Sequence, residues 1–299
     1  MKQSLARKTV AGISVVAVLA VIGCNGSKQN NDAVKNATPK MDSANSTQLK
    51  INNQIFSIPS PIQTALLIKK GGYTYNKSIL NVADNYHKYD TKYKKALNLG
   101  IYGADLGYIS LYNQSQDALA YMASLQKLAS DVGVGDMFSP ELVKRFNANM
   151  GNQDSLLAMV SEAFKKSDSY FKDRSQKDIS SLILIGGWVE SLYFAIQANN
   201  QKEQKEIITR IAEQKISLVS LVKMLQPYAS QPEFAGLAKD LGALSDMFDN
   251  VEFAYNYVPP TVDAKNKTTS INSTSTVKIT PEQLKAITDK VLAIRNQII

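Results

Sequence analysis

Two carboxylic acids stand alone in apolar stretches, where an acid is costly unless it has a partner or a chemical task. Asp105 is the only charged residue between positions 99 and 108, and Glu190 is the only one between positions 182 and 194. A carboxylate in such surroundings must be paired and hydrogen-bonded, or its pKa rises. Two of them could bind a cation or act as general acid and base. The alternative, which we favour, is that each is tied to Tyr, Lys or Asn side chains or faces solvent, and we assign no catalytic residue.

Aromatic residues flank both acids and extend the candidate site. Trp188, Tyr102 and Tyr108 are the aromatic members of a polar site, for a ligand or for structure, that would also hold the two acids. Tyrosine is concentrated in this part of the chain, at Tyr73, Tyr75, Tyr86, Tyr89, Tyr93, Tyr102, Tyr108, Tyr112 and Tyr121. These rings could line a groove for a glycan or peptide, because ring faces stack on sugars while the hydroxyls form hydrogen bonds. Packing between amphipathic helices explains them as well.

The cysteine and histidine counts exclude much other chemistry. Cys24 is the only cysteine and His87 the only histidine. A disulfide within the chain, a cysteine metal site and a multi-histidine zinc site are therefore impossible. Any Ser-His-Asp triad would have to use His87, which lies in a polar stretch and which we expect to be a solvated loop residue. We predict no metal and no cofactor.

The N-terminal segment has the pattern of a secretory signal peptide. Lys2, Arg7 and Lys8 form a basic start, and no charge occurs from Thr9 to the end of the segment at Gly23. Its uncharged core is shorter than the ~20 apolar residues that a membrane-spanning helix needs. We therefore expect residues 1–23 to be removed.

The residues Val21-Ile22-Gly23-Cys24 resemble the lipobox of bacterial lipoproteins. In that family a diacylglyceryl group is attached to the cysteine sulfur, the chain is cut just before the cysteine, and the new amino terminus is acylated, for example with palmitate. The resemblance implies a protein held at the membrane by its lipid chains, since each buried methylene contributes about 0.8 kcal/mol. Asn25 follows the cysteine where an Asp retains enteric lipoproteins at the inner membrane. We therefore expect the outer membrane, with the protein on its periplasmic or surface face.

Beyond the anchor, residues 24–54 read as the lipidated cysteine and a flexible tether. Residues 25–50 are rich in Asn, Ser, Gln, Lys and Ala and hold almost no large apolar side chain, so they cannot bury enough surface to fold. Removal of residues 1–23 takes away three positive charges, and the formal net charge falls from +8 to +5. The lysines are scattered and form no basic stripe, so no nucleic-acid partner is expected.

From residue 55 onward the apolar periodicity is helical, and residues 55–299 are predicted to form a single all-α domain. Helix starts are marked by Ser60-Pro61, Ser139-Pro140 and Thr280-Pro281, and the first and last of these also have a glutamine that can complete a capping box, Gln63 and Gln283. The predicted helices are 60–70, 91–113, 115–132, 139–149, 153–173, 176–199, 203–226, 233–249 and 280–298. About eight or nine helices in one chain indicate a multi-helix bundle or stacked helical hairpins. Residues 258–279 are predicted to be an exposed loop, with a short β excursion around 275–279 left open.

Three glycines share one face of the helix predicted over 91–113. Gly100, Gly103 and Gly107 lie three and four residues apart, and each costs about 1 kcal/mol relative to alanine in a helix. Such a cost is usually offset by close approach to another backbone. We therefore expect this face, Gly103 included, to pack tightly, so that a leucine at position 103 would overpack it.

Residues 100–108, Asn113-Gln114 and Gly186-Gly187-Trp188-Val189-Glu190 resemble motifs of exported helical lipoproteins of Bacteroidota. The resemblance covers most of residues 55–255 and implies a helical envelope protein, without an activity, cofactor or catalytic residue. Gly-Trp-Val-Glu is also similar to a motif of imelysin-like helical proteins, although their His-containing motif is missing, and no function follows from it.

The sequence thus favours a lipid-anchored binding or accessory module of the cell envelope rather than an enzyme. Its partners would be the membrane, through the N-terminal lipid, and a protein, peptide or glycan ligand. One alternative is a cation-dependent or hydrolytic enzyme that uses Asp105 and Glu190. Another is a structural partner in envelope assembly, because helical faces are common interaction surfaces.

The lipid anchor gives the first testable prediction. Because acylation requires the sulfur of Cys24, the Cys24→Ser variant should be released from membranes or remain as an uncut precursor. Labelled fatty acid supplied to expressing cells measures this directly. Equal labelling of the wild type and Cys24→Ser would contradict the lipoprotein assignment.

Overall fold

The computed structural model describes most of the chain beyond the N-terminal region. The described residues are 46–51, 54–59, 61–149, 152, 155, 159, 176–265 and 267–299. The predicted signal peptide, the proposed lipidation site Cys24, the predicted tether up to residue 45, the proposed cap Ser60 and nearly all of the predicted helix 153–173 lie outside them.

The all-α prediction is confirmed. The other predicted helices are all present, and their ends differ from the prediction by two residues or fewer. The α-helices are α1 Pro61–Lys70, α2 Lys92–Leu111, α3 Ser115–Val132, α4 Pro140–Ala148, α6 Lys177–Gln201, α7 Lys205–Leu225, α8 Pro232–Asp249 and α9 Pro281–Ile298. Short 3-10 helices connect them: η1 Lys77–Ile79, η2 Ala83–Lys88, η3 Gly135–Phe138 and η4 Gln226–Tyr228.

Two of the predicted helix starts have the expected caps. The Thr280 hydroxyl accepts from Gln283 N, and the Gln283 side chain accepts from Thr280 N, which completes the capping box of α9. The Ser139 hydroxyl accepts from Leu142 N at the start of α4. These side chains satisfy backbone N–H groups that have no partner within their helix.

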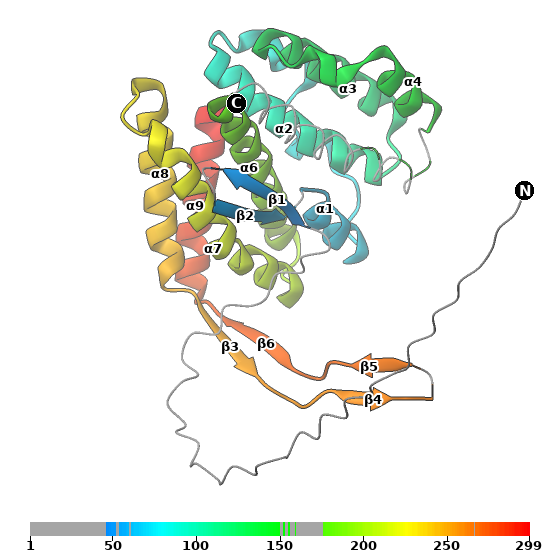
Figure 1. Cartoon of the computed structure of the whole chain (residues 1–299), viewed down its shortest axis with the longest axis vertical. Helices are drawn as coiled ribbons and strands as arrows, with labels where there is room; N and C mark the ends of the chain where they lie inside the picture. The colour runs from blue at the N-terminus through cyan, green and yellow to red at the C-terminus, as the bar shows by residue number, and fades with distance from the viewer. Residues whose placement is uncertain are drawn as a thin grey trace, which may run out of the picture. The chain divides into compact units, whose positions relative to one another are not determined.

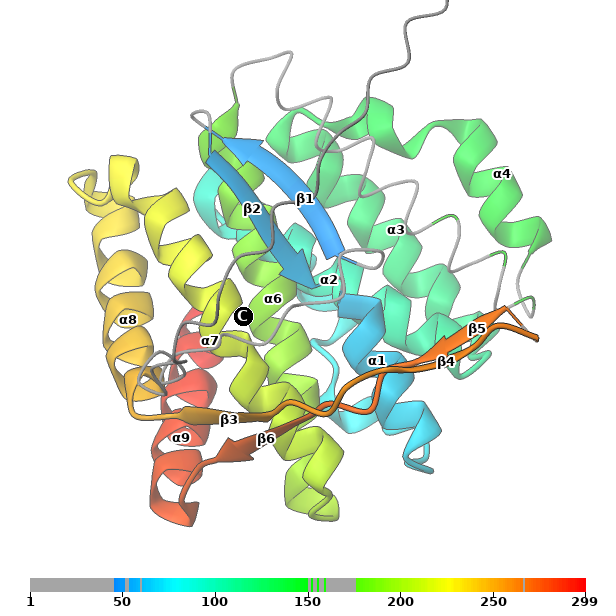
Figure 2. The same cartoon turned by 60° about the horizontal axis from the view of Figure 1, so that its bottom comes forward.

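The central helix is α6, which packs against α1, α2, α7 and α9 (Figures 1 and 2). On one side α2 separates it from α3, and on the other side α7 lies between it and α8. By length and composition α6 is apolar enough to cross a membrane, but most of its residues are buried inside the bundle. It is thus apolar on nearly all sides because other helices surround it.

A β-hairpin precedes the bundle and corrects the predicted extent of the tether. Strands β1 Ser46–Ile51 and β2 Gln54–Pro59 pair antiparallel, with Ser46 opposite Pro59, and β2 lies beside α7. Polar and apolar residues alternate from Gln48 to Ile51, which is typical of a strand. The hairpin was not predicted because its two strands have only six residues each and the segment before them has a strongly polar composition.

A second β structure, between α8 and α9, corrects the predicted loop 258–279. Strand β3 Glu252–Asn256 pairs with β6 Thr274–Lys278, and β4 Thr261–Asp263 pairs with β5 Thr268–Ser270. The four strands form a two-stranded arm (Figure 1). The segment is exposed, as predicted, but its main chain is paired along much of its length, and β6 covers most of the β excursion that the sequence left open.

The glycines bring the backbones of α2 and α6 into contact. A Cβ atom added to Gly186 would overlap the carbonyl group of Leu97, and one added to Gly100 would overlap the carbonyl oxygen of Ile183 and lie 2.7 Å from Gly187 N. Only glycine fits at positions 100 and 186 without moving a main chain. The expectation for Gly103 is wrong, because a Cβ there meets nothing within 4 Å.

These two environments predict opposite effects of the same substitution. Gly186→Ala should lower the free energy of unfolding by about 1–3 kcal/mol or more, because α2 and α6 must separate. Gly103→Ala should raise it by roughly 0.5–1 kcal/mol through better helix propensity. Chemical denaturation of both variants tests this contact. Equal denaturation midpoints would show that the close approach of α2 and α6 does not determine stability.

Candidate functional site

The two isolated acids come together in the core, each with a fully buried side chain. Asp105 lies on α2 and Glu190 on α6, and both have 0% exposure. Glu190 forms a two-point ion pair with Arg295 of α9, in which Nε is 2.6 Å from Oε2 and Nη2 is 2.7 Å from Oε1. Two parallel hydrogen bonds make this the strongest form of the carboxylate–guanidinium pair.

Arg295 was missed in the sequence and connects three parts of the fold. Its Nη2 also donates to the carbonyl oxygen of Ile79 in η1, at 3.2 Å. Its guanidinium carbon lies 3.9 Å from the centre of the Tyr193 ring, a cation–π arrangement. A signal was present: Arg295 follows Val291 by four residues and so shares the apolar face of α9.

Asp105, in contrast, faces this ion pair and the main chain of Asn81. Neither of its carboxyl oxygens makes a hydrogen bond of standard geometry with a described residue. Its neighbours are the carboxylate of Glu190, the guanidinium of Arg295 and the main chain of Asn81. Burial first, and then the negative charge of Glu190, raise the pKa of Asp105 well above its ordinary value, and Arg295 opposes this.

The proton is best placed on Asp105 and the negative charge on Glu190. Burial also raises the pKa of Glu190, but the hydrogen bonds and charge of Arg295 lower it. A neutral Asp105 removes one buried charge and turns its carboxyl group into a donor toward Glu190. The cluster then holds one anion and one cation, which is the lowest-cost arrangement of three ionisable groups in a closed core.

This arrangement fits a structural role for the two acids. Both oxygens of Glu190 are occupied by Arg295, and neither acid has exposed surface. Within the part of the chain that the structure describes, no group of three or more His, Cys, Asp or Glu side chains is placed to hold a metal ion. In this conformation a substrate reaches neither carboxyl group, and general acid–base chemistry requires such contact.

The assignment of the proton predicts how pH acts on stability. Asp105 titrates near pH 4 when unfolded and higher when folded, so the unfolded chain releases this proton first as pH rises. The free energy of unfolding should then fall with pH above about 4, by about 1.4 kcal/mol per pH unit, until the raised pKa of folded Asp105 is passed.

Two amide substitutions separate the roles of the acids. Asp105→Asn mimics the protonated acid, so it should remove this pH dependence and raise stability at neutral pH. Glu190→Gln leaves Arg295 buried without its anion and should cost about 3–5 kcal/mol. Urea unfolding of both variants between pH 4 and 8 is the measurement. A loss of stability at pH 7 in Asp105→Asn as large as in Glu190→Gln would show that Asp105 is ionised.

The aromatic members of the predicted site have separate tasks. Trp188 Nε1 donates to Gln214 Oε1 at 2.9 Å, between α6 and α7. The Tyr102 hydroxyl donates to Val82 O at 2.7 Å, next to η2. Both rings are buried, so these two residues support the fold and not a groove.

Several other tyrosines hold the segment that connects α1 and α2. The Tyr121 hydroxyl donates to Asn81 O at 2.7 Å, and the Tyr112 hydroxyl donates to Tyr73 O at 2.8 Å. Together with Tyr102, these tyrosines use their hydroxyls to fix the segment between α1 and α2 by its carbonyl groups. This satisfies backbone acceptors that lack a helix or sheet partner.

Tyr108 is the predicted site residue that borders an open pocket. The pocket has a volume of about 220 Å³ and lies between the segment after α1, helix α2 and the last turns of α6. Its walls are formed by Ile68, Tyr73, Thr74, Asn76, Ile79, Tyr108, Phe194, Gln197, Ala198, Asn200 and Gln201. Neither Asp105 nor Glu190 is among them, so the structure separates the acids from the cavity.

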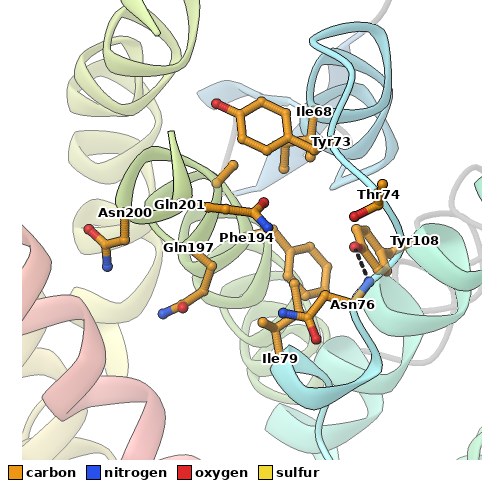
Figure 3. Close-up of a pocket in the computed structure, with 11 residues that line it drawn as sticks. Ile68, Tyr73, Thr74, Asn76, Ile79, Tyr108, Phe194, Gln197, Asn200 and Gln201 are labelled. Atoms are coloured by element: carbon orange, nitrogen blue, oxygen red, sulfur yellow. Dashed lines mark hydrogen bonds between the residues drawn. The ribbon is translucent and has the colours of Figure 1, made fainter. Parts of the chain in front are cut away.

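The pocket combines an aromatic inner wall with an amide rim (Figure 3). The rings of Tyr108 and Phe194 pack with their centres 4.9 Å apart. The Tyr108 hydroxyl accepts a hydrogen bond from Asn76 N at 3.1 Å, which fixes this ring against the segment after α1. No lining residue carries a formal charge.

The rim residues on α6 were missed in the sequence. Gln197, Asn200 and Gln201 end the most apolar helix of the domain, and their spacing of three and four residues places them on one helix face. A cluster of amides at the end of an otherwise apolar helix was a usable signal. Their proximity to Thr74 and Asn76 depends on the path of the segment between α1 and α2. The sequence of that segment has no helical or strand periodicity from which its path could be predicted.

No family model, curated protein or solved structure matches this chain. The chemistry of the pocket and of the buried acids is therefore the basis for the proposed function.

Proposed function

We propose that the protein is a lipid-anchored binding module of the cell envelope, which holds a small uncharged ligand in the pocket between α1, α2 and α6. The observation that carries this is the lining: an aromatic inner wall, a rim of amide and hydroxyl groups, and no charged side chain. A concave site with apolar walls and a few convergent polar groups is the usual form of a small-ligand site.

The uncharged lining selects against ionic ligands. A ligand with a formal charge would lose hydration on entry and meet no opposite charge among the lining residues, which is unfavourable. A neutral ligand with hydroxyl or amide groups would exchange water for the side chains of Thr74, Asn76, Gln197, Asn200 and Gln201. The pocket thus favours neutral polar compounds.

The enzyme alternative has less support. It would use Asp105 and Glu190, which are fully buried, and Glu190 is neutralised by Arg295. Neither acid borders the pocket. An enzyme of this kind would have to open its core for each turnover.

A role as a partner in envelope assembly draws support from the β-arm. Four large apolar side chains are exposed there, those of Tyr255, Tyr257, Val262 and Ile271. Exposed apolar residues gathered in one segment are typical of interaction sites. This role is compatible with a ligand pocket on the helical bundle. The lipid anchor at Cys24 would keep both the β-arm and the ligand pocket at the membrane.

Side-chain amide signals in nuclear magnetic resonance spectra test the binding proposal. The probes are glucose and N-acetylalanine methylamide, which are neutral, and glucuronate and glucosamine, which are ionic. At least one neutral probe should shift the amide signals of Asn76, Gln197, Asn200 and Gln201 more than either ionic probe does. Thr74→Trp should fill the mouth of the pocket and abolish the shifts, whereas Thr74→Ser should keep them.

The amides of Gln226 and Gln231 serve as internal controls, because they are exposed and do not line the pocket. Shifts at these control positions of the same size would indicate a general solvent effect. An absence of shifts with every probe, or a preference for the ionic probes, would contradict the proposed function.

A further inference from the structure

We propose that the β-arm pairs edge to edge with the β-arm of a second copy of this chain, so that the two β6 strands lie antiparallel beside each other. The β-arm runs from Glu252 to Lys278 and contains β3, β4, β5 and β6. This pairing is independent of the pocket and of its ligand. It is carried by the free edges of the β-arm, by the difference between them, and by the positions of the apolar side chains.

The β-arm has two strands and no third strand beside them. In the part of the chain that the structure describes, β6 pairs only with β3, and β5 only with β4. The β-arm connects the end of α8 with the start of α9, and β4 and β5 lie at its far end (Figure 2). In an antiparallel pair every second residue directs its N–H and C=O away from the partner strand. A two-stranded ribbon is at best marginally stable on its own, so a further strand would stabilise the β-arm.

The two edges of the β-arm differ in how well they are protected. Proteins protect a free edge with charged side chains and proline, because either one disfavours an added strand. The edge formed by β3 and β4 has two acids and two prolines: Glu252, Pro259, Pro260 and Asp263. The edge formed by β5 and β6 has no charged residue and no proline from Thr268 to Val277. The added strand is therefore expected beside β6.

An uncharged edge of this kind suits a second copy of itself. Strands β5 and β6 consist mainly of Ser and Thr, which form favourable cross-strand pairs with one another. Two identical antiparallel strands are related by a twofold axis, so the interface closes as a dimer and does not extend into a fibre. A bilayer is a poorer partner, because the polar main-chain groups of an open edge find no partner in hydrocarbon.

The apolar side chains of this edge select one register. Ile271 and Val277 are the only large apolar residues of the uncharged segment, and their even spacing places them on one face where the segment is extended. With the twofold axis at Thr274, Ile271 of each copy lies opposite Val277 of the other, which covers a side chain that is 81% exposed in one copy. Lys278 then lies opposite Ser270, so no two charges of the same sign meet across the pair.

A cysteine introduced at the twofold axis tests the pairing. The protein used is the chain from residue 24 onward with Cys24→Ser, which has neither lipid nor another thiol. Cα atoms directly opposite each other in an antiparallel pair are about 4.5–5.5 Å apart, a distance that a disulfide can bridge. Under mild oxidation Thr274→Cys should therefore form a disulfide-linked dimer.

Asn256→Cys is the matched control for this cross-link. Asn256 lies opposite Thr274 within the β-arm and is also exposed. In the proposed dimer, however, the two Asn256 residues are separated by three strand spacings, roughly 14 Å. The yield of linked dimer from Asn256→Cys should be at least about tenfold lower than from Thr274→Cys, because such a distance is too long for a disulfide.

Analytical ultracentrifugation measures the pairing without a cross-link. The unlipidated chain should dimerise reversibly at roughly 1–100 μM, as expected for a small interface. Ile271→Lys places a charge on the free edge and should weaken dimerisation by at least about tenfold. Tyr257→Lys changes another exposed apolar residue, on the other strand of the β-arm, and should leave dimerisation unchanged.

Three results would overturn the proposal. The first is a chain that stays monomeric up to roughly millimolar concentration, with no cross-link through Thr274→Cys. The second is equal cross-linking through Asn256→Cys and Thr274→Cys, or a dimer that Ile271→Lys leaves intact, since the interface would then lie elsewhere. The third is cross-linking of Thr274→Cys in cell membranes to a different protein and not to a second copy.

Discussion

The direct contact between the backbones of α2 and α6 sets the geometry of the rest of the bundle. At Gly100 and Gly186 there is no room for a side chain, so the two helices approach more closely than larger residues would allow. Asp105 and Glu190 lie four or five residues further along the same helices, and their carboxyl groups are neighbours as a result. A contact made of glycine thus produces a core in which two acids must share one cation and one proton.

The buried acids and the pocket are joined by one residue. Arg295 donates to the carbonyl oxygen of Ile79, and the side chain of Ile79 lines the pocket. The same ion pair that neutralises Glu190 therefore also fixes part of the pocket wall. An ion pair in this place adds little stability over an apolar core, but the hydrogen bonds of Arg295 are directional and define where the segment between α1 and α2 lies. Tyr121 and Tyr102 act on the same segment through its carbonyl groups.

The helices were predictable because their signals are local. The capping box at Thr280 and the apolar stripe of α9 are contained within one turn or a few turns of the chain. The partner of Glu190 was not predictable in this way, because it lies 105 residues away and depends on how α9 docks. The prediction that Gly103 is tightly packed was wrong for a similar reason. Its helix face was correct, but only at Gly100 and Gly107 of that face would an added Cβ atom meet a neighbour. Pocket residues such as Gln197 are polar at the end of an apolar helix, and only the fold shows what they face.

The separation of Glu190 from Arg295 also bears on the order of folding. At a synthesis rate of roughly 5–20 residues per second, Glu190 is made some 5–20 s before its cation. During that interval α2 and α6 can already meet, but their pairing would trap an anion without a counter-ion in an apolar interior. The complete cluster of Asp105, Glu190 and Arg295 can therefore form only after the final helix has been made.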